Sequence, residues 1–197
     1  MTEHIDVDLR GVDWYARELI GERFLRCDFS EADLTEVTTT DCVFEECSFG
    51  GARLNASVHR RSAFLRCALR RTNLFDVTFE GCKLAGTVVA EGCTLRPLQV
   101  TGGDWSYMTL RGVDLGGVVL DGVRLTGADL SMADLRGASL RGCDLTAARF
   151  HETLLTGTDL RETVVDGVDL TGLDLTGALV DPAFAVAFAI AHGAEVC

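Results

Sequence analysis

A chain of 197 residues with 47% hydrophobic residues and only two prolines is long enough for one domain with a buried core and too apolar to be disordered. Thirty acidic against eighteen basic residues give a net charge of −12, which argues against direct binding to nucleic acid or to an anionic membrane. The N-terminus lacks the cationic and apolar regions of a secretion signal, and no apolar run reaches about eighteen residues, so a soluble, cytoplasmic protein is expected.

The dominant feature of the sequence is a five-residue repeat of large apolar side chains. It runs from Leu9 to Val89, where fifteen of seventeen positions are apolar, slips by one residue near Gly92, and continues through eighteen apolar positions from Leu95 to Val180. Small residues such as Ala128 and Cys143 stand two positions before each large one. A helix has a period of 3.6 and a strand a period of 2, so neither keeps one residue in five facing inward. The repeat therefore predicts a coil of short sides, each followed by a corner.

Glycines recur two residues after the large apolar positions, where the corners are expected. Glycine supplies the backbone freedom that a tight corner needs. The glycines that fit this pattern are Gly117, Gly122, Gly127, Gly137, Gly142, Gly157, Gly167, Gly172 and Gly177.

The runs ADLSM, ADLRG, ASLRG, CDLTA and TDLRE match the signature A(D/N)LXX, and over roughly residues 7–181 the chain resembles the pentapeptide-repeat proteins. The resemblance implies a right-handed, four-sided β-helix with twenty residues per coil. We therefore expect an all-β, quadrilateral β-helix of about eight coils over residues 1–181, a rod of roughly 40 Å at the usual strand spacing. The expected stacks include Phe24, Phe44 and Phe64, and also Cys27, Cys47 and Cys67.

The C-terminal segment, residues 182–197, is expected to cap the rod with a short helix. Asp181 and Pro182 are typical of a helix start, Ala183 to His192 continues it, and Gly193 stops it. Because this helix is apolar nearly all round, one face can cover the last coil while another joins a second copy of the chain. A simple monomeric cap is the alternative. The residues expected at the dimer interface are Phe184, Ala187, Phe188 and Ala191.

Cysteines and histidines do not form a recognisable catalytic or metal-binding pattern. Seven of the eight cysteines fall on the small interior position, where we expect reduced thiols that serve packing; a straight stack does not offer zinc the tetrahedral ligands it needs. His59 occupies a core position and is expected to form a hydrogen bond with Thr39. We therefore expect no enzymatic activity, no cofactor and no metal.

Charge is distributed unevenly along the chain. The segment from Arg53 to Arg71 contains six arginines and no acid, and either binds something anionic or balances charge elsewhere on the rod. No base follows Arg161, whereas six acids do, so acid concentrates toward the presumed dimer end. The acids expected to contact a partner are Asp114, Asp129, Asp134, Asp159, Asp166, Asp169 and Asp174.

Three stretches outside the generic repeat carry a narrower resemblance. HRRSAF (59–64), TLRPL (94–98) and AVAFAIAHG (185–193) are similar to stretches of fluoroquinolone-resistance members of the pentapeptide-repeat family. That resemblance implies a homodimeric DNA mimic that binds and inhibits DNA gyrase, a type II topoisomerase, and protects it from fluoroquinolones. The alternative is an acidic scaffold or adaptor without a topoisomerase partner.

Overall fold

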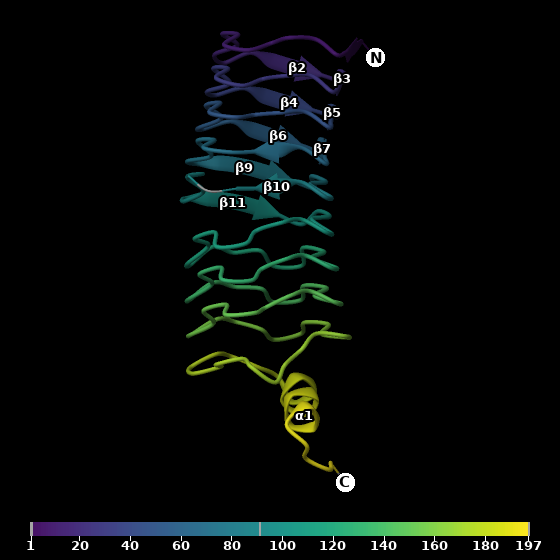
Figure 1. The fold of residues 1–197 in the computed structure, drawn as a ribbon, viewed down its shortest axis with the longest axis vertical. Helices are drawn as coiled ribbons and strands as arrows, with labels where there is room; N and C mark the ends of the chain where they lie inside the picture. The colour runs from purple at the N-terminus through teal and green to yellow at the C-terminus, as the bar shows by residue number, and fades with distance from the viewer. Residues whose placement is uncertain (1, 91, 197) are drawn as a thin grey trace.

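The computed structural model describes residues 2–90 and 92–196 as a rod of stacked, four-sided coils with one helix at its C-terminal end (Figure 1). The chain advances along the rod from one end to the other, so the two termini lie at opposite ends. This arrangement confirms the β-helix fold class expected from the five-residue repeat.

The strands in the described part of the chain are short, and every pairing among them is parallel. They are β1 (Glu3–Ile5), β2 (Glu18–Ile20), β3 (Arg23–Leu25), β4 (Thr38–Thr40), β5 (Val43–Glu45), β6 (Val58–Arg60), β7 (Ala63–Leu65), β8 (Ala68–Leu69), β9 (Val77–Glu80), β10 (Val88–Val89) and β11 (Leu98–Thr101). They form three sheets on different sides of the rod, ordered β1-β3-β5-β7, β10-β8 and β11-β9-β6-β4-β2.

The pairing register confirms the stacking period of twenty residues. Phe24 pairs with Phe44, and Phe44 with Phe64. Their rings are stacked with centroids 5.0 and 4.7 Å apart. Pairs that span the expected slip are offset by twenty-one residues, as Val88 and Thr109 are, and later pairs such as Asp104 and Arg124 return to twenty, so one extra residue is inserted near Gly92 as the sequence predicts.

Regular strands give way to single bridges toward the C-terminus. The five-stranded sheet spans five successive turns, and later turns keep the same parallel register through isolated pairs such as Asp144 with Val164 and Asp159 with Leu179. One side of the rod is followed by a continuous ladder of Asp8, Asp28, Ser48, Ala68, Val88, Thr109, Asp129 and Arg149. Outward-facing side chains twenty residues apart are therefore direct neighbours.

The corners adopt the left-handed backbone conformation whether or not glycine is present. Gly117 has φ of 70°, but Arg66 and Met132 have φ of 52° and 61° at equivalent corners. Of the nine corner glycines expected from the sequence, eight have positive φ and Gly172 does not. The fold thus imposes the conformation on the corner, and glycine only lowers its cost.

The C-terminal helix α1 (Pro182–Ala191) begins one residue before the expected Ala183 and ends one residue before the expected His192. Asp181 caps it, with its Oδ1 accepting the backbone N–H of Phe184 at 2.9 Å. A second bond, from the backbone N–H of Glu162 to Asp181 Oδ2 at 2.6 Å, ties the helix start to the preceding coil. No helix of the described residues combines the length and apolarity needed to cross a membrane.

Candidate interaction surfaces

Most arginines are neutralised by an acid of the same or the neighbouring coil. Of the seventeen arginines, twelve form such ion pairs among the described residues. Arg26 with Asp6 and Arg61 with Asp41, each at 2.7 Å, join residues twenty apart. The coil geometry itself creates these pairs, because it stacks such residues directly.

The basic segment from Arg53 to Arg71 loses most of its charge in this way. Arg53, Arg60, Arg61 and Arg66 pair with acids of adjacent coils. For these four arginines the charge-balance interpretation of the sequence is correct. Arg70 and Arg71 have no ion pair among the described residues.

The seven acids expected to contact a partner do not form one surface. Asp114 and Asp134 lie in one ladder, whereas Asp129 and Asp159 belong to two others on different sides of the rod. Three of the seven are neutralised at 2.5–2.6 Å: Asp114 by Arg96, Asp134 by Arg136 and Asp159 by Arg161. The sequence predicted that these acids lie on the rod, but it did not show that they lie on different sides of it.

The last coil, which follows Arg161, holds several acids and no arginine or lysine. Asp166, Asp169 and Asp174 have no ion pair in the described chain. Asp169 Oδ1 accepts the hydroxyl of Thr171 at 2.6 Å and its backbone N–H at 3.0 Å, and Asp174 accepts the same two bonds from Thr176. These hydrogen bonds lower the pKa of both carboxyls, so both are ionised at neutral pH. The expected concentration of acid near the C-terminal end is therefore present.

The same end of the rod leaves part of its apolar interior uncovered. Central residues of the middle coils, such as Leu120 and Leu140, are completely buried, whereas Val165, Leu175 and Val180 of the last coils are only half-buried. Helix α1 follows the last coil at this end of the rod (Figure 1). A free end of this kind needs a further cover.

Helix α1 uses a different face toward its own coil than the sequence indicated. Phe184, expected to anchor a second chain, is 3% exposed and packs into the core of its own rod. This is a correction: Phe184 caps its own coil, because it lies in the first helical turn, which Asp181 ties to the preceding coil. Phe188, Ala187 and Ala191 also pack against that core but stay half-buried.

The helix face that points to solvent was missed by sequence reasoning. Val186 is 41% and Ile190 55% exposed, one helical turn apart. Leu179, in the coil just before the helix, is 50% exposed. Because the helix is apolar nearly all round, no signal in its sequence distinguishes this exposed face from the buried one.

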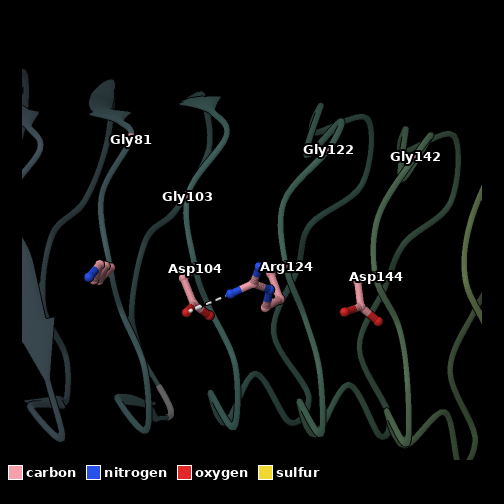
Figure 2. A pocket seen from close by; sticks show the side chains of 8 residues that line it. Gly81, Gly103, Asp104, Gly122, Arg124, Gly142 and Asp144 are labelled. Carbon is pink, nitrogen blue, oxygen red and sulfur yellow. Dashed lines mark hydrogen bonds and ion pairs between the residues drawn. The ribbon is translucent and has the colours of Figure 1, made fainter.

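A shallow hollow of about 450 Å³ crosses four coils on one side (Figure 2). Glycines line one border, and the outward residues Lys83, Asp104, Arg124 and Asp144 alternate in sign along it. Arg124 and Asp104 form an ion pair at 3.4 Å. The alternation leaves no net charge to select a ligand.

The cysteines of the described chain are free, and six of the seven are buried, as expected for packing residues. Cys93 is the half-buried one. Burial raises the pKa of Cys82 to about 11 and that of Cys143 to about 12, which makes these thiols unreactive. In residues 2–90 and 92–196 no group of three or more His, Cys, Asp or Glu side chains is placed to hold a metal ion.

Comparison with known proteins identifies the repeat. The family model of pentapeptide repeats matches eight copies, in residues 23–58, 109–142 and 143–179. The chain belongs to the pentapeptide repeat family.

Two curated relatives in the family are both named pentapeptide repeat protein MfpA. The protein of Mycobacterium tuberculosis is 43% identical over 88 residues, 45% of this chain and 48% of the relative. That of Mycolicibacterium smegmatis is 41% identical over 54 residues, 27% of this chain and 28% of the relative. The chain thus spans about half the length of the first relative in the match, and less of the second.

Solved structures of the family share the fold. A trypsin-treated form of QnrB1, a plasmid-mediated fluoroquinolone resistance protein, superposes with a TM-score of 0.69 at 21% identity, covering 100% of this chain and 99% of QnrB1. HetL, a pentapeptide repeat protein involved in heterocyst differentiation regulation in the cyanobacterium Nostoc, gives a TM-score of 0.51 at 20% identity over 90% of this chain and 86% of HetL. Members with this fold therefore differ in function, and the surface of this chain must decide its own.

Proposed function

We propose that this pentapeptide repeat protein is a cytoplasmic homodimer that mimics DNA, binds and inhibits DNA gyrase, and protects the enzyme from fluoroquinolones. The function is one of binding and not of catalysis. Similarity to MfpA and the fold shared with QnrB1, a plasmid-mediated fluoroquinolone resistance protein, support this proposal.

The observation that carries the proposal is the uncompensated acid of the last coil. Elsewhere the coil geometry neutralises most charges in pairs, but Asp166, Asp169 and Asp174 keep theirs in the described chain. A partner that reads negative charge would meet its strongest field at this end.

The dimer places two such ends together. Val165, Leu175 and Val180 are incompletely covered, and Val186 and Ile190 extend the apolar surface over helix α1. A twofold axis at this end would cover that surface and continue one rod into the next. Acids of both copies would then flank the junction.

Charge density is consistent with a DNA-like object. Duplex DNA carries about one charge per 1.7 Å, or roughly 24 charges over about 40 Å. A net charge of −12 on a rod of that length is about half the density. A basic groove built for DNA can accept such a surface at moderate salt.

A gyrase supercoiling assay tests the proposal. Purified protein should inhibit supercoiling in proportion to its concentration and reduce drug-stabilised DNA cleavage. If supercoiling is unchanged at about a tenfold molar excess of the protein over gyrase, where a specific complex should be nearly saturated, the proposal is rejected.

The second candidate function is an acidic scaffold or adaptor. The neutralised middle of the rod favours it, because ion-paired coils present a regular, rigid surface. Affinity capture distinguishes the two: recovery of type II topoisomerase subunits supports the mimic, and recovery of unrelated proteins with no topoisomerase supports the scaffold.

A further inference from the structure

Five arginines of the described chain form no ion pair, and four of them lie on one side of the rod. Arg17 is accounted for, since its guanidinium stacks over Trp14 at 4.5 Å. The other four follow the ladder that runs from Ala68 to Arg149. They are Arg70, Arg71, Arg111 and Arg149.

The ladder places these arginines together. Arg149 is itself a rung, and Arg70 and Arg111 each follow a rung, Ala68 and Thr109, by two residues. Residues at the same offset from successive rungs share one side of the rod. The side chain of Arg71 runs along the rod toward the next coil, where a Cβ on Gly92 would lie 3.1 Å from its Cγ.

Apolar side chains stand between the arginines. Val88, a rung of the same ladder, is 40% exposed, and Met132 is 48% exposed. The guanidinium of Arg111 contacts the sulfur of Met132 at 3.2 Å, so charge and apolar surface are continuous there. We call the four arginines with Val88 and Met132 the arginine surface.

We propose that the arginine surface is a docking site for a short acidic and partly apolar segment of a partner protein. Guanidinium groups form strong bidentate bonds with carboxylates, and arginine beside exposed apolar side chains is typical of protein interfaces. The site is separate from the acidic end and recognises the opposite charge.

The length of the surface favours a peptide over nucleic acid. From the Ala68 rung to the Arg149 rung there are four strand spacings, about 19 Å. Acids border it on both sides, Asp28 and Glu31 before it and Glu152 and Asp169 after it. A polyanion running along the rod would be repelled beyond the arginines, whereas a segment of about six extended residues, roughly 20 Å long, fits between the borders.

The charge count keeps the surface positive. Among the described residues of this side, four arginines stand against two acids, Asp129 on the same ladder and Glu152 at its far end. On a chain with a net charge of −12 this is a local inversion of sign. An acidic segment is the complementary occupant.

Fluorescence anisotropy with a labelled synthetic peptide of alternating glutamate and leucine tests the assignment. The double variant R70E/R111E should weaken peptide binding about a hundredfold, since each lost charge-assisted contact costs about tenfold. The matched control R136E/R161E makes the same charge change at ion-paired positions on other sides and should weaken it less than about threefold. Thermal melts confirm that both variants are folded.

Other outcomes overturn the proposal. Equal loss in both variants would show a general charge effect, and absence of binding to the wild type would show that the surface does not take such a segment. Tighter binding of a duplex DNA probe than of the peptide, lost in R70E/R111E, would assign the surface to nucleic acid instead. Gyrase inhibition measured on R70E/R111E separates this site from the acidic end: retained inhibition leaves the proposed function standing whatever the peptide result.

Discussion

Thr39 Oγ1 lies 2.8 Å from Nδ1 of His59, one coil further along the rod, inside the core. The Thr39 hydroxyl donates its own proton to Ser62 Oγ at 2.9 Å, so it accepts from Nδ1–H. The Ser57 hydroxyl lies 2.9 Å from Nε2 on the other side of the ring and donates to it. The network holds a neutral imidazole, and it confirms the bond to Thr39 expected from the twenty-residue stacking.

Stability should fall with acid because of this ring. Burial lowers the pKa of His59 from 6.5 to about 3, so the unfolded chain takes up the proton first as pH falls. The contribution of the neutral ring to the free energy of unfolding is complete above pH 6.5. It is lost progressively down to about pH 3, by about 5 kcal/mol in all. Urea unfolding of the wild type and of His59→Phe between pH 7 and about pH 4 measures it.

The difference between the two proteins isolates His59 from the carboxylates, which titrate in both. Phenylalanine fits the site, since Phe79 stacks on His59 with centroids 5.2 Å apart. The variant also loses stability because the Thr39 and Ser57 hydroxyls no longer have the imidazole as a partner, but this loss does not change with pH. A free-energy difference that does not change with pH would contradict a neutral buried ring.

Two corner glycines offer a matched test of backbone conformation. Gly117 has φ of 70°, whereas Gly172 lies outside the left-handed region, and a Cβ on either would meet nothing within 4 Å. Gly117→Ala should therefore destabilise the protein by about 1 kcal/mol, and Gly172→Ala should be neutral or stabilise it by up to about 1 kcal/mol. Chemical denaturation at neutral pH compares them. Equal effects would mean that the two corners share one conformation.

The parts of the fold that depend on neighbouring residues in one ladder were predictable from the sequence. The five-residue repeat and the coil of twenty residues set the stacking of Phe24 on Phe44 and of Thr39 on His59. In a parallel register, each residue must pair with the one twenty positions along. The same rule predicts the pairing of Asp41 with Arg61. Counting charge along the sequence instead made Arg61 look like part of a basic patch.

Features that depend on a choice between equivalent faces were not predictable. Helix α1 is apolar nearly all round, so its pattern does not distinguish Phe184, which is buried, from Ile190, which is exposed. The arginine surface emerges only after the paired arginines are removed from the count. Both require packing in three dimensions, and the repeat alone does not contain it.

Substitutions in helix α1 should separate capping from dimer formation. Phe184→Ala removes a side chain that is 3% exposed and should lower stability by about 3 kcal/mol. Ile190→Asp changes a side chain that is 55% exposed, so it should leave the monomer stable while splitting the dimer. Phe188→Asp, at a half-buried position, should do both.

Sedimentation at micromolar concentration, together with thermal melts, measures the two effects. Ala183→Asp, at an exposed position on the first turn of the helix, is the control for added charge. An Ile190→Asp variant that still sediments as a dimer would place the interface elsewhere.

Removing the uncompensated acids should weaken gyrase inhibition more than removing paired ones. The variant Asp166→Asn, Asp169→Asn and Asp174→Asn keeps an amide oxygen as acceptor for Thr171 and Thr176, so the turns should persist. At about 0.1 M salt inhibition should weaken about tenfold or more, and the salt dependence of binding should become shallower.

The matched control replaces three ion-paired acids, Asp114, Asp134 and Asp159, by asparagine and changes the net charge by the same three units. If the position of the charge matters, this control should inhibit gyrase nearly as well as the wild type, because those acids already share their charge with arginines. Equal weakening in both triple variants would mean that only total charge counts. Inhibition by the wild type that does not depend on salt would exclude DNA mimicry, since the attraction between an acidic rod and a basic groove must fall as ions screen it.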